Sequence, residues 1–209
     1  MIKIGIDVGS TTAKLVAVDE NDNLLFSKYE RHNAKAKETI LSFLKQLLSE
    51  IGDKDISVRI TGSIGMGISE KCSLPFVQEV VAAAKAIQKD YSHVTSMIDI
   101  GGEDAKVVFF NDAEATDLRM NGNCAGGTGA FIDQMAIILG VNIDELNQLA
   151  MNATQVYPIA SRCGVFCKTD IQNLIAKNVS RENIAASIFR AVAVQTVVTV
   201  SYTHLRAHE

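Results

Sequence analysis

The sequence reads GIDVGSTTAKLV at residues 5–16 and MIDIGGEDAKVV at residues 97–108, and the two segments align without a gap. Each copy is an apolar stretch that ends in Asp-x-Gly, with Asp7 in the first copy and Asp99 in the second. A tight polar turn and a second apolar stretch follow, and a lysine begins that stretch in both copies. Self-similarity of this kind predicts that the chain is built from a duplicated unit.

The elements around the repeat predict an α/β layered fold. Apolar residues spaced three and four apart between Ile40 and Ile51 predict an amphipathic helix that ends near Gly52. The other predicted elements up to residue 100 are strands at residues 2–8, 13–18, 24–29 and 57–61, a helix at residues 77–87 and a strand at residues 96–100. The first three strands should form a meander.

Composition excludes several classes of protein. The 209 residues exceed a typical domain by a factor of roughly 1.4, which suits one large domain or two small ones. With 47% hydrophobic and 21% charged residues, the chain is expected to fold. A formal net charge of -4 argues against a nucleic-acid partner. The longest apolar runs, residues 80–84 and 191–200, are too short to span a membrane, and no signal peptide fits before the first strand, so we expect a cytoplasmic protein.

The repeated turns offer chemistry for a nucleotide and its metal ion. A carboxylate at a strand end, followed by a glycine-rich turn with free backbone N–H groups, lets phosphate oxygens and a cation meet. Mg²⁺ takes one or two protein carboxylates and keeps most of its waters, so Asp7 and Asp99 would suit a magnesium nucleotide. Either turn alone could equally be a plain hairpin. Lys14 and Lys106 could face solvent or contact phosphate.

These turns resemble the two phosphate motifs of the actin, sugar-kinase and heat-shock-chaperone ATPase superfamily, whose duplicated ribonuclease-H-like halves clamp ATP. Within it, residues 120–131 (MNGNCAGGTGAF) and 161–166 (SRCGVF) resemble signature segments of the 2-hydroxyacyl-CoA dehydratase activators. That family includes the ATPase subunits of benzoyl-CoA reductase. Residues 131–135 and 167–172 are most similar to the activase region of the long fused CoA-substrate activases. The resemblance extends to about Thr199.

The resemblance implies a role for each matching residue. Asp7 and Asp99 would serve Mg²⁺ and the attacking water. The residues implied to hold the phosphates of ATP are Gly9, Ser10, Thr11, Thr12, Gly101, Gly102, Gly127 and Thr128. A second interpretation of the 126–129 glycine run is a simple cap at the start of a helix.

The chain has four cysteines, and two of them stand just before predicted helices, where a thiol pKa is lowered and metal ligation is favoured. Isolated cysteines are more often buried, but the resemblance implies that Cys124 and Cys163 bind a [4Fe-4S] cluster shared by two subunits, since a cubane takes four thiolates. Cys167 could be an inert core thiol or, at its spacing from Cys163, an alternative ligand. Cys72 is expected to pack in the interior.

The predicted domain boundaries follow from the repeat. Residues 1–95 are expected to form the first ribonuclease-H-like half and residues 96–199 the second. The resemblance implies that this second half is incomplete, because the superfamily's last strand and its glycine-rich adenosine loop have no match after Thr199. Residues 200–209 resemble a translated sequencing adapter and are expected to be a non-native tail that breaks the preceding helical pattern.

The resemblance implies an ATP-dependent activase of anaerobic metabolism. It would pass an electron from its iron–sulfur cluster to a 2-hydroxyacyl-CoA dehydratase or a benzoyl-CoA-reductase-like partner, with reduced ferredoxin or flavodoxin as donor. One alternative is a sugar or N-acetyl-sugar kinase of the same superfamily without a cluster. Another is an actin-like or chaperone-like nucleotide switch without redox chemistry.

Overall fold

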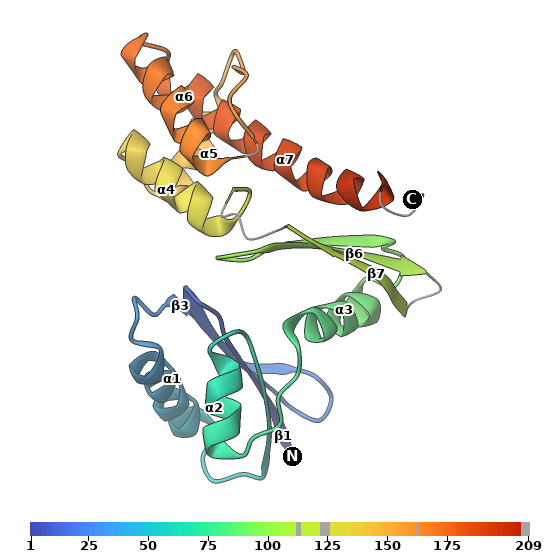
Figure 1. Ribbon diagram of the computed structural model, residues 1–209. Coiled ribbons are helices and arrows are strands. Elements are labelled where there is room, and N and C mark those ends of the chain that lie inside the picture. The colour runs from blue at the N-terminus through green and yellow to red at the C-terminus, as the bar shows by residue number, and fades with distance from the viewer. Residues whose placement is uncertain (112–113, 122–125, 162, 206–209) are drawn as a thin grey trace. The chain divides into compact units, whose positions relative to one another are not determined.

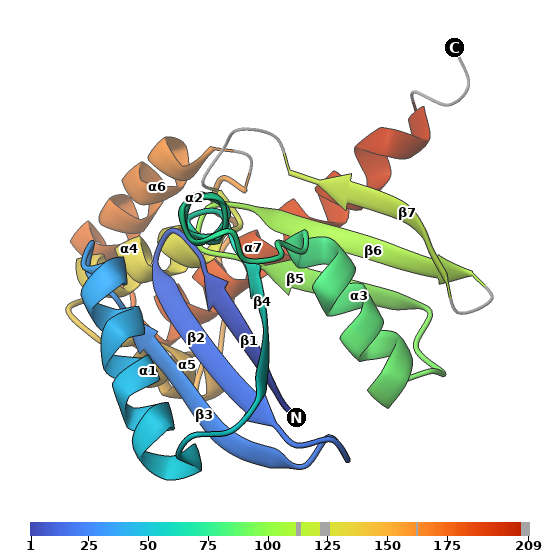
Figure 2. The same ribbon diagram turned by 90° about the horizontal axis from the view of Figure 1, so that it is seen from below.

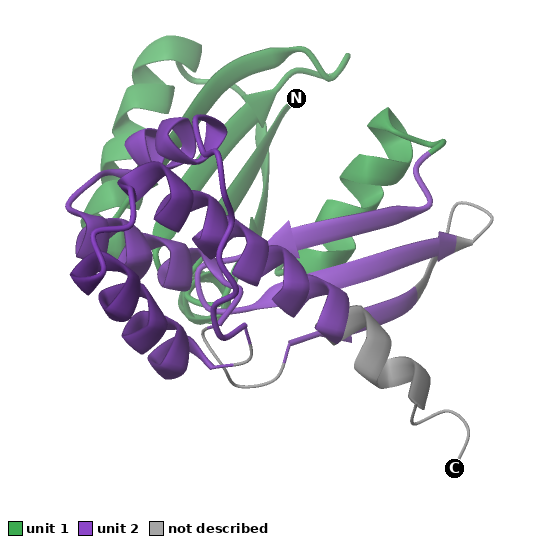
Figure 3. Cartoon of the chain, turned by 90° about the horizontal axis from the view of Figure 1, so that it is seen from above, with its two compact units in different colours: residues 1–93 green, residues 94–209 purple. Residues whose placement is uncertain are grey.

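The computed structural model of the chain describes residues 1–111, 114–121, 126–161 and 163–205. Contacts divide the chain into two compact units, Met1–His93 and Val94–Glu209 (Figure 3). Among the described residues, no helix combines the length and the apolar character that a membrane crossing requires.

Unit 1 is a mixed sheet with helices. Its elements are β1 (Ile2–Val8), β2 (Thr12–Val18), β3 (Leu24–Arg31), α1 (Ala36–Ile51), β4 (Ile56–Thr61), α2 (Gly65–Cys72) and α3 (Glu79–Asp90). The strand order is β3-β2-β1-β4 (Figure 2). The first three strands are antiparallel neighbours, as the predicted meander requires, and β4 runs parallel to β1.

One face of this sheet carries the core of unit 1. Alternate residues of β1 are buried, and they pack with Leu15 of β2, Phe26 of β3 and the apolar stripe of α1. The stripe, Ile40, Phe43, Leu47 and Ile51, is the one that the sequence predicted. Figure 1 shows α1 and α2 beside these strands. Because side chains alternate along a strand, Asp7 belongs to the opposite face.

A turn between β2 and β3 is tied to the end of α3. The carboxylate of Asp22 accepts hydrogen bonds from Lys3 Nζ at 2.9 Å and from Lys89 Nζ at 2.5 Å. These bonds, the one from Lys89 first, lower the pKa of Asp22 to about 2. The cluster therefore links three elements that lie far apart in the sequence.

Unit 2 combines an antiparallel sheet with a group of helices. Its elements are β5 (Ser96–Ile100), β6 (Ala105–Asn111), β7 (Glu114–Met120), α4 (Gly129–Leu139), α5 (Ile143–Met151), α6 (Gly164–Ala176) and α7 (Arg181–Leu205). The strand order is β5-β6-β7. The helices share a core that includes Phe131, Met135, Leu146, Ile171 and Ile188.

The duplication predicted from the sequence is visible in backbone pairing. Asp7 pairs with Lys14 across β1 and β2, and Asp99 pairs with Lys106 across β5 and β6. The intervening turns are closed by equivalent hydrogen bonds, from Gly9 N to the Thr12 carbonyl at 3.0 Å and from Gly101 N to the Asp104 carbonyl at 2.8 Å. The two turns thus share both register and closure.

The second half differs from the first at its edge. In unit 1, β4 lies along β1, but no described residue of unit 2 pairs with the corresponding edge of β5. Ile98 and Ile100 of β5 are exposed. Among the described residues, the second sheet therefore has one strand fewer than the first.

Several local expectations need correction. The helix that the sequence predicts after Cys163 begins directly at Gly164, so Cys163 is its N-cap residue. The elements α2, α5 and β7 were not predicted. Cys72 is exposed rather than packed in the interior. The helix α7 runs on to Leu205, so the expected break at Val200 is absent, while the origin of residues 200–209 stays a prediction.

Candidate functional site

Asp7, the first predicted catalytic carboxylate, is held by a lysine from the neighbouring strand. Lys14 Nζ donates to Asp7 Oδ2 at 2.6 Å. The side chains are 42% exposed for Lys14 and 20% exposed for Asp7. Burial alone would lower the pKa of Lys14, but the hydrogen bond and the charge of Asp7 raise it above its usual value. The other oxygen, Asp7 Oδ1, is buried and has no hydrogen-bond partner among the described residues.

The first predicted phosphate turn, which contains Gly9, Ser10, Thr11 and Thr12, is braced by a histidine that the sequence did not single out. His32 is buried, and its Nε2 lies 3.0 Å from the carbonyl oxygen of Gly9. A carbonyl only accepts, so Nε2 carries the proton in this contact. The backbone N–H of His32 also donates to the carbonyl of Thr11 at 3.3 Å. Both bonds hold the turn from its carbonyl side.

The turn at residues 62–64, which follows β4, lies directly against Asp7. Gly62 follows β4 with φ +91°, and a Cβ built there would be 2.4 Å from the Val8 carbonyl oxygen and 2.6 Å from Asp7 Oδ1. Only glycine fits so close an approach. Ile64 N donates to the same Val8 carbonyl at 3.0 Å. Thr61 Oγ1, just before this turn, is buried and unpaired among the described residues.

Asp7, Lys14 and Thr61 line a cavity of about 460 Å³ on the sheet face opposite α1. The alternation of side chains explains its composition, because residues two apart on each strand share this face. They are Gly5 and Asp7 from β1, Lys14 and Val16 from β2, and Arg59 and Thr61 from β4. Ala82 and Lys85 of α3 also line the cavity, together with Ile6, Ile60 and Val77. The cavity thus joins the Asp7–Lys14 pair and Thr61 within unit 1.

The second repeated turn lies in unit 2 and is bonded to the start of α4. Gly129 N donates to the Gly101 carbonyl at 2.8 Å, and Ala130 N donates to the Gly102 carbonyl at 3.0 Å. The structure thus brings the 101–102 turn together with the glycine run at 126–129. Asp99 stands on β5 beside this turn.

Gly127 and Thr128 shape the start of α4. Gly127 has φ +80°, and a Cβ there would be 2.7 Å from Cγ of Gln195 on α7. Thr128 is fully buried and is the N-cap residue, with its hydroxyl accepting from Phe131 N at 3.4 Å. Helix capping is therefore a visible role of Thr128, and phosphate binding by Gly127 and Thr128 stays a prediction.

The structure separates the roles of the neighbouring cysteines. Cys163 is partly buried at the N-cap of α6, and Val165 and Phe166, two and three positions further on, are 71% and 66% exposed. Cys167 is 1% exposed in the helical core, where burial and the nearby charge of Asp170 raise the pKa of its thiol to about 11. Cys124 lies outside the described residues.

Residues 4–206 match the BadF/BadG/BcrA/BcrD ATPase family. The chain belongs to this family. Because this is a family of ATPases, membership implies that the chain binds ATP.

Relatives of this ATPase include a 2-hydroxyisocaproyl-CoA dehydratase activator of Clostridioides difficile, 31% identical over 92% of this chain and 73% of the relative. The chain is also 27% identical in sequence to component A of the Acidaminococcus fermentans (R)-2-hydroxyglutaryl-CoA dehydratase, which has a crystal structure. It superposes with a TM-score of 0.88 over 97% of this chain and 78% of that one. The activator of the 2-hydroxyisocaproyl-CoA dehydratase from Clostridium difficile with bound ADPNP is 29% identical, with a TM-score of 0.86 over 97% and 76%.

The α/β fold expected from the sequence is confirmed by these structures. A more distant likeness, to the ethanolamine utilization protein EutJ from Carboxydothermus hydrogenoformans at 16% identity and a TM-score of 0.51, concerns the fold alone.

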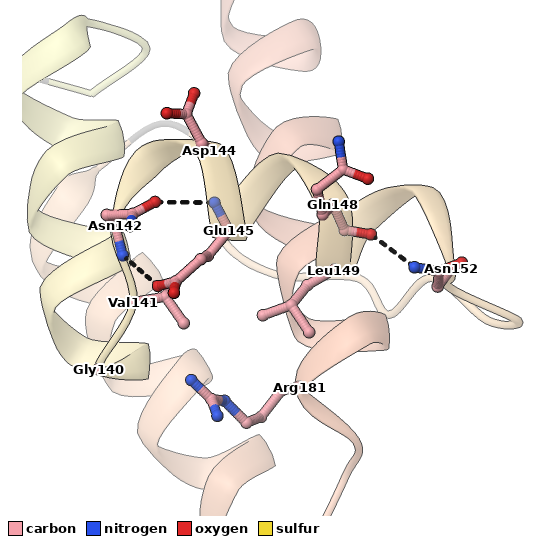
Figure 4. A pocket seen from close by; sticks show the side chains of 9 residues that line it. All are labelled: Gly140, Val141, Asn142, Asp144, Glu145, Gln148, Leu149, Asn152 and Arg181. Carbon is pink, nitrogen blue, oxygen red and sulfur yellow. Dashed lines mark hydrogen bonds between the residues drawn. The ribbon is translucent and has the colours of Figure 1, made fainter.

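The ATPase has a further hollow in unit 2, of about 530 Å³, that contains none of the predicted site residues (Figure 4). It lies at the start of α5, where Asn142 Oδ1 accepts from Glu145 N and Glu145 Oε2 accepts from Asn142 N, both at 2.9 Å. Arg181 donates to the Leu139 carbonyl at 2.7 Å. These polar groups cap helix ends, so the hollow is explained by the packing of α4, α5 and α7.

Proposed function

We propose that this chain is an ATP-dependent activator that passes an electron from a [4Fe-4S] cluster, shared by two copies, to a CoA-thioester dehydratase or reductase. Family membership and relatives named as dehydratase activators support this function. The observation that carries it is the repeated Asp-x-Gly turn, whose second copy is hydrogen-bonded to the start of α4 immediately after the Cys124 segment.

The first turn suits a magnesium nucleotide. Asp7 Oδ1 is a buried carboxylate oxygen with no partner among the described residues, and such an atom favours a cation or a cation-bound water. The adjacent turn offers the N–H groups and hydroxyls of Ser10, Thr11 and Thr12 to phosphate oxygens. Asp7 and Asp99 would face Mg²⁺ and the attacking water, and Gly9, Gly101 and Gly102 would approach the phosphates.

The bonded contact at α4 offers a route from nucleotide to cluster. A displacement of the 101–102 turn would act on Gly129 and Ala130 through their N–H groups. Residue 124 stands five positions before Gly129, so the same displacement would reach the Cys124 segment through a short stretch of chain. Coupling of this kind requires only that the two nucleotide states favour different positions of the turn.

Cys163 suits a ligand that a second copy must complete. It stands partly buried at a helix start beside exposed Val165 and Phe166, which is a surface that another protein chain could cover. Two thiolates from Cys124 and Cys163 of each copy would make the four that a cubane takes. The cluster would supply one-electron transfer. Cys167 does not suit this role, because its side chain is buried in the core of its own unit.

The proposed partners follow from this chemistry. They are a second copy of the chain, a 2-hydroxyacyl-CoA dehydratase or benzoyl-CoA-reductase-like protein that receives the electron, and a reduced ferredoxin or flavodoxin that supplies it.

Anaerobic purification with iron and sulfide analysis tests the proposal. We expect about four irons for each pair of chains, with an EPR signal after reduction. Cys163→Ala should lose the iron, while Cys167→Ala, a matched control four residues away, should retain it. An iron-free protein that phosphorylates a sugar or N-acetyl sugar would support the kinase alternative instead.

A further inference from the structure

The chain that leads to Cys163 is held by side chains of unit 2. Residues 154–160, which we call the strap, lie outside the helices and strands. The backbone N–H groups of Thr154 and Gln155 both donate to Asn183 Oδ1 on α7, at 2.9 and 3.0 Å. The start of the strap is therefore fixed to α7.

The end of the strap is bonded to α6. Ala160 N donates to Asp170 Oδ2 at 2.8 Å, in a partly buried position. Hydrogen bonds to an ionised acceptor are about twice as strong as those between neutral groups. Ala160 stands three positions before Cys163, and Asp170 stands seven positions after it. This one bond therefore ties together the two sides of Cys163.

The reach of the chain leaves this connection little slack. Seven residues of α-helix rise about 10.5 Å and make nearly two turns, so Asp170 lies below the helix start on the same face as Cys163. The Asp170 side chain tilts toward the helix start and covers part of that rise. Three residues of chain reach at most about 11 Å. With Ala160 bonded to Asp170, the chain can place the nitrogen of Cys163 only within a narrow range.

The direction of the Cys163 side chain depends on both of its backbone neighbours. The helix holds the carbonyl side, because the Cys163 carbonyl accepts from Cys167 N at 3.0 Å. The strap holds the nitrogen side through Asp170. The side chain of Cys163 makes no capping hydrogen bond to its own helix. The backbone on its two sides therefore determines where the thiol points.

The start of α6 lies against α4, the helix that follows residue 124. A Cβ built at Gly164 would be 3.5 Å from the ring of Phe131. Phe131 is buried in the first turn of α4. The strap thus orients Cys163 beside the helix that follows the second cysteine of the proposed cluster.

We propose that Asp170 is a positioning residue for Cys163. By accepting from Ala160 N, its carboxylate fixes the direction of the Cys163 thiol as a ligand of the cluster. Groups behind a metal ligand commonly orient it in this way. The part of this assignment that concerns iron rests on the proposed function, whereas the hold on Cys163 is a property of the metal-free chain.

The test compares Asp170→Ala, which removes the acceptor, with Asp170→Asn, whose side-chain carbonyl can still accept from Ala160 N. Asn183→Ala is the matched control at the start of the strap. Modification of Cys163 by iodoacetamide in the metal-free full chain is measured by peptide mass spectrometry, relative to exposed Cys72. We expect Asp170→Ala to raise the rate at least about threefold, because local opening exposes a partly buried thiol. The other two variants should stay within about twofold of the original.

Release of iron to a chelator, after anaerobic loading, is the second measurement. Asp170→Ala should release iron at least about tenfold faster than the original, since loss of a group behind a metal ligand weakens metal binding by about that factor. Asp170→Asn should retain iron as the original chain does. Urea unfolding of each variant reports its overall stability.

Several results would overturn the assignment. They are an unchanged rate of Cys163 modification or of iron release in Asp170→Ala, and an equal acceleration in Asn183→Ala, which would mean that the strap detaches as a whole. Faster modification of buried Cys167 together with a lower urea midpoint would show that Asp170 supports the helical core in general. An effect of Asp170→Asn as large as that of Asp170→Ala would assign the effect to charge and not to the hydrogen bond. An original chain that binds no iron would refute the proposed function, while the modification rates of the metal-free chain would still decide whether Asp170 holds Cys163.

Discussion

Replacing Gly62 with alanine should destabilise unit 1 and displace Asp7. The φ of +91° is unfavourable for a residue with a Cβ and costs about 1–3 kcal/mol. The added Cβ would also lie 2.4 Å from the Val8 carbonyl oxygen and 2.6 Å from Asp7 Oδ1, so β1 or the turn must shift. Overpacking of this kind costs about 1–3 kcal/mol more. The total of about 2–6 kcal/mol is a large share of a domain's stability.

Two other glycines of unit 1 provide matched controls. Gly52 has φ +65° with nothing within 4 Å of a built Cβ, so Gly52→Ala carries only the backbone cost of about 1–2 kcal/mol. Gly67 lies inside α2 with open space around it, and Gly67→Ala should stabilise the helix by about 0.5–1 kcal/mol. The difference between Gly62→Ala and Gly52→Ala isolates the close approach to Asp7.

The assay is equilibrium urea unfolding followed by circular dichroism, with Mn²⁺ binding measured on the same samples. Gly62→Ala should lose the most stability and should also weaken Mn²⁺ binding, whereas Gly52→Ala should leave binding unchanged. If Gly62→Ala unfolds at the same urea concentration as Gly52→Ala, the close approach of the turn to Asp7 contributes nothing to stability, and Gly62 is not required at this position.

Three further changes test other contacts. Lys14→Met removes the ion-pair partner of Asp7. Because the lysine is 42% exposed, the free energy of unfolding in urea should fall by only about 1 kcal/mol. An unchanged free energy of unfolding would show that the pair is solvated and contributes nothing. The lowered pKa of Asp22 means that its bonds stabilise the fold above about pH 4 and lose that effect as the pH falls toward 2. Asp22→Asn should therefore lower the melting temperature at pH 6 and much less at pH 2, and an equal deficit at both would contradict this. Iodoacetamide at pH 8 should modify exposed Cys72 and leave Cys167 unmodified, because Cys167 is buried and its thiol pKa is about 11. Peptide mass spectrometry measures both reactions. Faster modification of Cys167 than of Cys72 would refute the buried position of Cys167.

Much of the fold follows from local patterns in the sequence. The stripe from Ile40 to Ile51 predicts α1 because one apolar face at helical spacing can only be buried against the sheet. The strand at residues 96–100 agrees with β5 at both ends. The start of α6 was missed because Gly164 is a poor helix former and the exposed pair Val165 and Phe166 gives no amphipathic pattern.

The candidate site was only partly predictable, since its remaining parts arise from strand pairing between distant segments. Thr61 and Gly62 stand more than fifty positions from Asp7, and only the parallel register of β1 and β4 brings them together. His32 has no neighbouring histidine or cysteine in the sequence that would suggest a functional role. It follows the end of β3, and this position brings its ring within hydrogen-bond distance of the Gly9 carbonyl in the first turn. A glycine-rich run directly after a predicted strand was the available signal for Gly62.

The two repeated turns are closed by equivalent backbone hydrogen bonds but carry different side chains. Under the proposed function, this difference determines which turn could bind phosphate through its side chains. The first turn carries the hydroxyls of Thr11 and Thr12, while the second carries Glu103 and Asp104 at the same positions. Lys14 pairs with the strand-end carboxylate of the first copy, whereas buried Lys106 donates to Asp104 Oδ1 at 3.0 Å. Acidic side chains repel phosphate, so the second turn can approach a nucleotide only through its backbone. Its carbonyls accept from the start of α4, whereas the first turn is held by His32, so the two copies of the repeated turn differ in the contacts that they make.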